Sequence, residues 1–146
     1  KKLTYQTTDS GLSYADIKIG TGREVEVGRR VNMHFIGRLA GRQGWQFENT
    51  YENGEPFRFT LGRDRVLLGL EEGVKGMREG GKRRLVVPST IGYVDKSIMP
   101  VPVSFSNRQR LYATVLNEVR RTREREALGQ DLAGVVVLDV EVVRVL

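Results

Sequence analysis

The chain has 146 residues, enough for one domain with one hydrophobic core, and its 24 Lys and Arg against 18 Asp and Glu give a formal net charge of +6. The absence of cysteine excludes disulfides and thiolate metal sites, and the lone His34 cannot by itself build a metal site or a catalytic triad. No apolar run approaches the ~20 residues that a helix needs to span a bilayer.

The N-terminal stretch differs in character from the rest of the chain. Residues 1–9 are polar and show no apolar period, so we expect a flexible lead-in before a single domain over residues 10–146. Because the first residue is lysine rather than methionine, we expect a processed or trimmed product whose targeting segment is not visible.

Most of the remaining chain shows the patterns of strands and turns. The 17 glycines, together with one convincing long helical pattern, favour strands and turns over a helix bundle. Apolar residues alternate at the two-residue period of a strand in four segments: Val31–Leu39, Phe57–Leu61, Lys82–Val87 and Val136–Val145. We therefore predict an α+β fold built on a twisted antiparallel sheet of about five strands.

A short helix is predicted between the second and third of these segments. The residues that fall at the spacing of one helical face are Leu67, Leu70, Val74 and Met77. The strand period ends near Gly62, so the chain changes from strand to helix there. We expect a helix over Val66–Gly73, with the sheet wrapped over its apolar face.

An insertion over residues 95–134 precedes the last strand. Ser106 with Gln109 fits an N-terminal capping box, and Gly129 would end the helix. Apolar residues recur at four-residue spacing at Leu111, Val115 and Val119, so we predict one added helix of about 20 residues. Its apolar stripe needs a cover. The helix either packs on its own domain and shields a pocket mouth, or presents a docking face to another protein.

The helical part of this insertion, residues 106–128, is rich in arginine. Six arginines and three glutamates lie between Arg108 and Glu126. The distal half is polar on every side and should bury little apolar area, so we expect it to matter more for partner binding than for stability. The net charge permits an acidic partner, a membrane surface or RNA, but charge alone argues for association and not for a fold. The sequence shows no RNA-reading motif and no phosphate-cradling glycine loop, and we do not expect a nucleic-acid partner.

Several short motifs follow one another in a specific order and spacing: Ser10–Asp16, Gly20–Gly22, Val31–Leu39, Gly44–Thr50, Phe57–Met77, Gly80–Pro88 and Ile91–Tyr93. Over roughly 100 residues this series resembles the FKBP-type peptidyl-prolyl cis-trans isomerases. The long opening motif and the helical insertion are most similar to plastid members, many of which reside in the thylakoid lumen.

The resemblance implies a set of pocket residues. Catalysis would rest on Tyr93, Phe57, Phe47, Leu67 and Glu48, and substrate binding on Phe35, Val66, Leu70 and Leu138. The backbone N–H of Leu67 and the hydroxyl of Tyr93 would each donate to a substrate carbonyl. No metal and no cofactor is implied, and His34, next to the pocket strand, is interpreted as a structural residue with a satisfied ring.

The chemistry that the resemblance implies is rotation about the peptide bond before proline, which has a barrier of ~18–20 kcal/mol. A pocket that removes water and fits the twisted amide can lower this barrier without a nucleophile. Family members usually have Tyr, Asp, Trp and Phe where this chain has Phe35, Glu48, Leu70 and Leu138. Leu70 and Leu138 remove aromatic contact with the proline ring. Glu48 carries its carboxylate one methylene further out and should be poorly anchored.

Two hypotheses of different class follow. The first is a weak isomerase that acts on proline-containing segments of protein substrates. The second is a non-catalytic FKBP-fold subunit or assembly factor of a photosynthetic membrane complex, which docks through its inserted helix. Turnover of proline peptides separates them.

Overall fold

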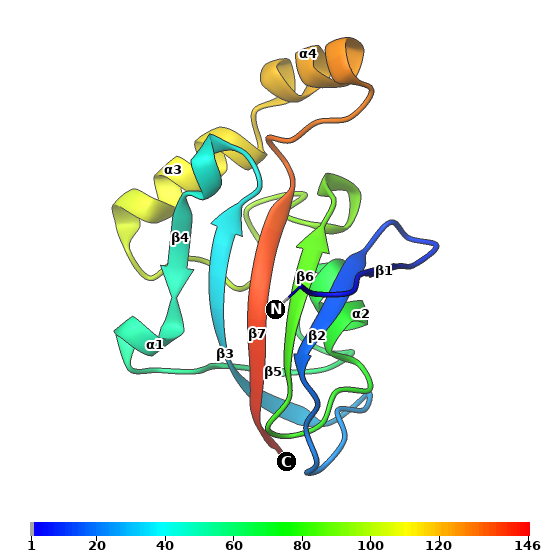
Figure 1. Cartoon of the computed structure of the whole chain (residues 1–146). Coiled ribbons are helices and arrows are strands. Elements are labelled where there is room, and N and C mark those ends of the chain that lie inside the picture. The colour runs from blue at the N-terminus through cyan, green and yellow to red at the C-terminus, as the bar shows by residue number, and fades with distance from the viewer. Residues whose placement is uncertain (1) are drawn as a thin grey trace.

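The centre of the protein is a seven-stranded sheet whose strands pair antiparallel in the order β1-β2-β6-β7-β3-β4, with β5 paired to β3 (Figure 1). The computed structural model describes residues 2–146. The strands are β1 Gln6–Thr7, β2 Ser13–Lys18, β3 Arg30–Leu39, β4 Gln46–Asn49, β5 Phe57–Thr60, β6 Lys82–Val87 and β7 Val136–Val145. The predicted antiparallel α+β fold is confirmed. The sheet exceeds the expected five strands because β1 and β4 are too short to show an alternating pattern.

The longest contact in the sheet joins β3 and β7, which pair from Val31 opposite Val145 to Leu39 opposite Val136. In both strands alternate side chains are buried, as the two-residue period requires. Gly37 lies on the buried side of β3, where an added Cβ would stand 2.6 Å from the ring of Phe47. A side chain at this position would push Phe47 out of place.

Helix α2, Leu68–Val74, packs against the sheet at β6 (Figure 1). It buries Leu70 and Val74. Gly69 and Gly73 allow the close approach, since a Cβ on either would lie 2.6 Å from side-chain atoms of β6. The predicted position of this helix in the core is confirmed. Its regular part begins after Leu67, which occupies the N-cap position.

The insertion forms two helices, α3 Phe105–Val115 and α4 Glu118–Leu128, so the prediction of one continuous helix is wrong. The chain leaves the helical conformation at Leu116, and the side chain of Asn117 then accepts a hydrogen bond from the backbone N–H of Arg120. Asparagine favours such a cap over a place inside a helix. Ser104, rather than Ser106, caps α3. Gly129 ends α4 in the left-handed conformation, as expected.

Three shorter elements complete the fold: α1 Thr50–Asn53 and the 3₁₀ helices Arg42–Gly44 and Ser89–Ile91. Part of the stretch predicted as a loose lead-in is ordered, because β1 pairs with β2 through Gln6 opposite Tyr14 and Thr7 opposite Ser13. Both β1 residues are exposed, so backbone pairing rather than apolar burial places them. No helix in residues 2–146 is long and apolar enough to cross a membrane.

Candidate functional site

The predicted pocket residues belong to many elements, and all of them except Glu48 lie in the hydrophobic core of the domain or pack against it. Phe35 lies on β3, Phe47 and Glu48 on β4, Phe57 on β5, Val66 and Leu67 just before α2, Leu70 on α2, Tyr93 after the 3₁₀ helix Ser89–Ile91, and Leu138 on β7. The rings of Phe35 and Phe57 meet edge to face at 6.3 Å, and those of Phe47 and Tyr93 at 6.1 Å. Of these residues, Phe35, Glu48 and Phe57 line one cavity.

The pocket is closed in this structure. Phe57 is half-buried, and the other pocket residues are buried, with Glu48 the most exposed of them at 8%. The cover is a segment of the insertion, residues 98–103 (the strap), in which Ile98, Pro100 and Pro102 are buried. The cavity that remains beside Phe35, Phe57 and Pro100 measures about 140 Å³. Small-molecule sites typically have ~300–1,000 Å³, so a substrate needs the strap to move.

The strap uses both hydrogen-bond donors that the resemblance assigns to a substrate. The backbone N–H of Leu67 donates to the carbonyl of Met99 at 3.1 Å. The hydroxyl of Tyr93 donates to the carbonyl of Pro100. Burial raises the pKa of Tyr93, and the charges of Tyr112 and Glu48 act in the same direction. The phenol therefore keeps its proton and remains a donor over the physiological pH range.

Glu48 is firmly held, contrary to the expectation that its longer side chain leaves the carboxylate poorly anchored. Oε1 accepts from the side-chain amide of Asn53 at 3.0 Å and from the backbone N–H of Asn49 at 3.2 Å, and Oε2 accepts from the backbone N–H of Val103 at 3.1 Å. The carboxylate thus bonds to the end of β4 at Asn49, to α1 at Asn53 and to the end of the strap at Val103. Glu48 therefore joins the pocket wall to its cover.

Helix α3 covers its own domain. Leu111 and Val115 are buried, the side-chain amide of Asn107 donates to the carbonyl of Phe47 at 3.2 Å, and the guanidinium of Arg110 lies 4.4 Å from the Trp45 ring centre. These contacts of α3 support the hypothesis that the insertion packs on its own domain and shields the pocket. Val119 on α4 is exposed, so the apolar stripe does not continue past the break.

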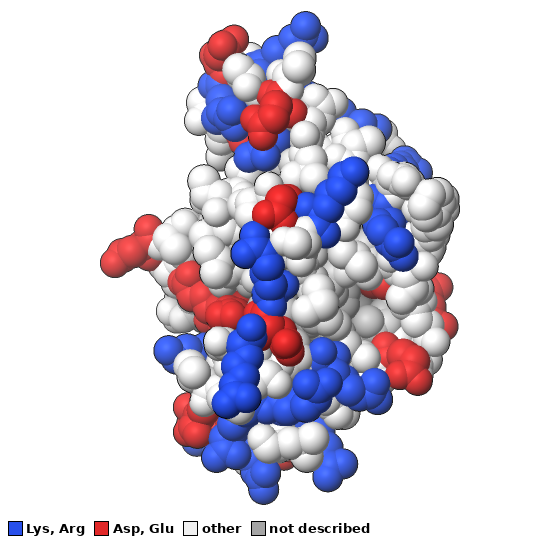
Figure 2. Space-filling model, turned by 180° about the vertical axis from the view of Figure 1, so that it is seen from behind, with Lys and Arg blue, Asp and Glu red and all other residues white. Residues whose placement is uncertain are grey.

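The charges of α4 are largely used within the chain. Arg125 and Arg121 contact the carboxylate of Asp131 at 2.8 and 3.6 Å, and Arg120 contacts Glu124 at 3.4 Å. Glu124 also accepts from the backbone N–H of Ala133 at 2.8 Å. Figure 2 shows basic and acidic side chains intermixed at the α4 end of the molecule, with more basic side chains gathered at the opposite end.

His34 takes a structural position. Its Nδ1 lies 2.9 Å from Oγ1 of Thr50, and its ring stacks on Tyr51 with centroids 4.5 Å apart. Oγ1 of Thr50 also accepts from the backbone N–H of Phe35 at 2.7 Å. The histidine thus helps to hold the strand that carries Phe35. Within residues 2–146, no group of His, Asp and Glu is arranged to hold a metal ion.

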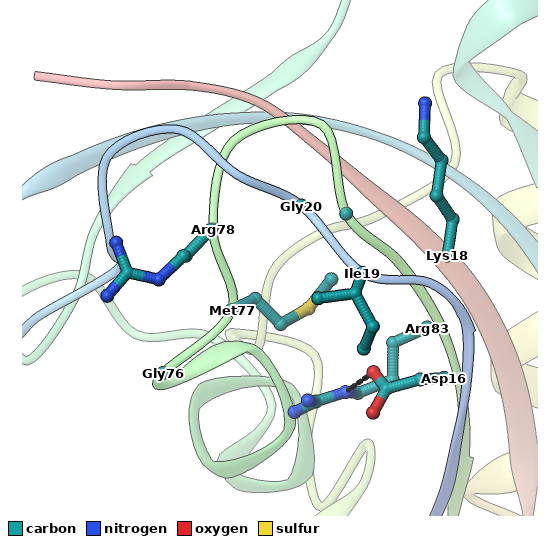
Figure 3. Close-up of a pocket in the computed structure, with 9 residues that line it drawn as sticks. Asp16, Lys18, Ile19, Gly20, Gly76, Met77, Arg78 and Arg83 are labelled. Carbon is teal, nitrogen blue, oxygen red and sulfur yellow. Dashed lines mark hydrogen bonds and ion pairs between the residues drawn. The ribbon is translucent and has the colours of Figure 1, made fainter.

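A second cavity, of about 130 Å³, lies outside the predicted pocket (Figure 3). It is bordered by the Asp16–Arg83 ion pair, 2.8 Å long, and by the backbone at Gly20 and Gly76. Close backbone packing shapes it, because a Cβ on Gly20 would lie 2.3 Å from the carbonyl oxygen of Arg78. The residues that line this cavity include none of the predicted pocket residues.

A twisted sheet over a short helix, with an aromatic and aliphatic pocket at the start of that helix, defines an FKBP-like protein. The family described as FKBP-type peptidyl-prolyl cis-trans isomerase matches residues 21–116. The chain belongs to this family. It is 41% identical over 139 residues to the chloroplastic peptidyl-prolyl cis-trans isomerase FKBP17-1 of Arabidopsis thaliana, covering 91% of this chain and 59% of the relative. It is 36% identical over 126 residues to the chloroplastic FKBP19 of the same plant, covering 78% and 49%.

Solved structures show the same fold. The crystal structure of FkpA from Escherichia coli is 26% identical, with a TM-score of 0.67, over 99% of this chain and 53% of that one. The crystal structure of AtFKBP13 is 24% identical, with a TM-score of 0.65, over 97% and 98% of the two chains. The chain spans about half the length of the curated relatives FKBP17-1 and FKBP19.

Sequence reasoning did not find the strap as part of the site. The run Met99–Val103 was visible as a proline-containing segment at the start of the insertion. Its contacts to Leu67, Tyr93 and Glu48 are made mainly by backbone atoms. Because every residue has a backbone carbonyl and every residue except proline has a backbone N–H, the sequence holds no signal for these contacts.

Proposed function

We propose that this chain is a peptidyl-prolyl cis-trans isomerase that acts on X-Pro bonds of protein segments, with weak activity. One observation carries the proposal: the pocket holds an X-Pro dipeptide of its own chain. Leu67 donates to the carbonyl of the Met99–Pro100 amide, and Tyr93 donates to the carbonyl of Pro100 itself. The same two donors would position the corresponding carbonyls of a substrate.

Catalysis in this proposal comes from differential binding. The planar amide loses resonance as it twists, and the pocket walls formed by Phe47, Phe57 and Phe35 would exclude water while the twisted form is held. The N–H of Leu67 and the hydroxyl of Tyr93 fix the substrate on both sides of the rotating bond. Glu48 orients the edge of the pocket through its bonds to Asn53 and Val103.

The remaining pocket residues explain why the activity should be weak. Val66, Leu70 and Leu138, which are buried in the core, would form the apolar floor and wall for the proline ring. Leucine at positions 70 and 138 offers less flat surface than the Trp and Phe usual in the family. At about 1 kcal/mol for each lost aromatic contact, the two changes would reduce efficiency by tenfold or more.

The plastid, and within it the thylakoid lumen, is the proposed location. The names of FKBP17-1, FKBP19 and FKBP16-3, which is 38% identical over 96 residues, describe them as chloroplastic. The lumen rests on the similarity of the Ser10–Asp16 opening and of the helical insertion to plastid members found there. Import of the full-length precursor, tagged at its C-terminus, into isolated chloroplasts followed by thylakoid fractionation tests both statements.

The alternative, a non-catalytic subunit that docks through residues 106–128, has less support. Docking on charge needs side chains that are free to meet a partner, whereas Arg120, Arg121 and Arg125 contact acidic residues of the same chain. Leu111 and Val115 of α3 face the domain, whereas Phe105 at its start is exposed. The contacts of the insertion thus favour a cover for the pocket.

A protease-coupled assay on proline tetrapeptides tests the proposed activity. In a variant whose strap is released, replacing Tyr93 by phenylalanine should lower kcat/KM by about fivefold to tenfold, because one hydrogen bond of about 1–1.5 kcal/mol to the substrate is lost. Tyr51→Phe is the matched control, since its hydroxyl bonds to Glu141 outside the pocket. Equal kcat/KM for the strap-released variant with and without Tyr93→Phe would rule out the assigned pocket. A wild-type rate no higher than the uncatalysed one, also after strap release, would rule out the activity.

A further inference from the structure

We propose that the strap, residues 98–103, is a built-in ligand that occupies the X-Pro site and must leave before a substrate enters. This inference rests on the proposed function, because the strap occupies the same pocket that would bind the substrate. It concerns how access to that pocket is regulated. The chain would exist in a closed state, which is the one seen here, and in an open state that binds proline segments.

The strap is bound by contacts of the kind a peptide ligand makes. Val66 and Met99 form a parallel β-bridge, the N–H of Met99 donates to the carbonyl of Arg65 at 2.9 Å, and the carbonyl of Met99 accepts from Leu67 at 3.1 Å. This is the addition of an extended segment to a backbone edge, in which main-chain hydrogen bonds hold the ligand and side-chain pockets select it.

The buried side chains of the strap complete the resemblance to a ligand. Pro100 lines the remaining cavity together with Phe35, Phe57 and Glu48, and it is buried. Tyr93 and Glu48 bind the backbone of the strap at Pro100 and Val103. A substrate cannot use the donors of Leu67 and Tyr93 while the strap holds them, so the two ligands exclude each other.

Both ends of the strap are attached through surface contacts that could release it without unfolding the core. Before the strap, exposed Arg65 bonds to Asp95 at 2.8 Å and to Ser97 at 2.5 Å. After it, Arg108 donates to the carbonyl of Pro102 at 3.2 Å. These contacts join the strap to the start of α2 on one side and to α3 on the other.

The first test compares Pro100→Gly with Pro88→Gly, which makes the same change outside the strap. Both gain the same backbone freedom in the unfolded chain, but only Pro100→Gly removes a ring from the pocket. Since kcat/KM scales with the open fraction, a closed state populated above about nine-tenths predicts a rise of at least about tenfold for Pro100→Gly and none for Pro88→Gly. Circular dichroism checks that both variants are folded.

A surface variant covers the case in which Pro100→Gly does not fold. Arg65→Ala removes an exposed pair of the kind that is worth ~0.2–1 kcal/mol, so it should raise kcat/KM by about 1.4-fold to fivefold. Arg63→Ala, an exposed change two residues away, should leave it unchanged. Equal rates for the wild type and for every folded variant, all above the uncatalysed rate, would overturn the proposal.

Binding separates the strap from the isomerase activity. A fluorescent peptide of residues 98–103, Ile-Met-Pro-Val-Pro-Val, should bind Pro100→Gly at least tenfold more tightly than it binds the wild type, as measured by anisotropy. Adding Tyr93→Phe should weaken that binding. If neither the wild type nor any variant isomerises peptides but this pattern of binding is found, the proposed activity is refuted and the proposal that the strap occupies the pocket is supported. Equal binding by the wild type and Pro100→Gly would refute the strap even if both turn over.

Discussion

Asp131 is predicted to be a major contributor to stability, although it lies in a charged and apparently solvated part of the sequence. Its side chain is 3% exposed and accepts from Arg125 at 2.8 Å, from the hydroxyl of Ser89 at 3.3 Å and from the backbone N–H of Gly134 at 3.2 Å. Arg121, whose side chain is 13% exposed, lies 3.6 Å away. The carboxylate therefore ties α4 to the end of β6 and to the start of β7.

Asp131→Asn keeps the shape of the side chain and removes its charge. Loss of one partner of a buried ion pair costs about 3–5 kcal/mol, and the half-exposed position of Arg125 reduces this to about 2–3 kcal/mol, because water can solvate that guanidinium. At ~3 °C per kcal/mol for a chain of this size, the melting temperature should fall by roughly 6–9 °C.

Thermal unfolding followed by circular dichroism measures this change, with Glu26→Gln as the control. That variant also turns a carboxylate into an amide, but Glu26 is 56% exposed and pairs with exposed Arg29, so its cost should stay below about 1 kcal/mol. A fall for Asp131→Asn no larger than that for Glu26→Gln would refute the structural role of the buried carboxylate. The expectation that the polar half of the insertion matters little for stability would then stand.

Two further predictions concern the pocket and the acid limit of stability. The double variant Leu70→Trp, Leu138→Phe should raise turnover in the peptide assay only when it is combined with Pro100→Gly. Both leucines are fully buried, so with the strap closed the larger rings should lower the free energy of unfolding by about 1–3 kcal/mol, as measured by denaturant unfolding. Hydrogen bonds from the backbone N–H groups of Val145 and Arg23 lower the pKa of Glu79 below its ordinary 4.5. The contribution of Glu79 to stability is therefore present above pH 4.5 and is lost as the pH falls through its lower pKa in the folded state. Glu79→Gln should flatten the loss of stability below about pH 4.5 in acid titrations, and an unchanged acid slope would contradict this.

The sequence by itself determined the fold class and the chain order of its main elements. The two-residue period of β3, β5, β6 and β7 and the helical spacing around Leu70 are local patterns, and each reports which face of an element is buried. Family motifs placed the pocket residues in one cluster for the same reason, since those motifs mark the core. Gly129 was readable as a helix end because the left-handed conformation selects glycine.

Other features were decided by tertiary structure. The break between α3 and α4 depends on Asn117 acting as a cap, while the apolar spacing across it fits one helix equally well. In the sequence, α4 looks like a solvated polar helix. In the structure, Arg121 and Arg125 contact Asp131, which lies in the turn after the helix. Whether Glu48 is anchored depends on Asn53 and on the backbone of Val103, which is 55 residues away.

The closure of the pocket is the clearest case. The strap holds Leu67, Tyr93 and Glu48 with two backbone carbonyls and one backbone N–H. All residues except proline carry both groups, so no sequence pattern marks these contacts. The resemblance to the family indicated which residues would line a proline pocket. Only the path of the chain through space decides that its own Met99–Pro100 segment lies in that pocket, because the contact is set by where the insertion returns and not by which side chains it bears.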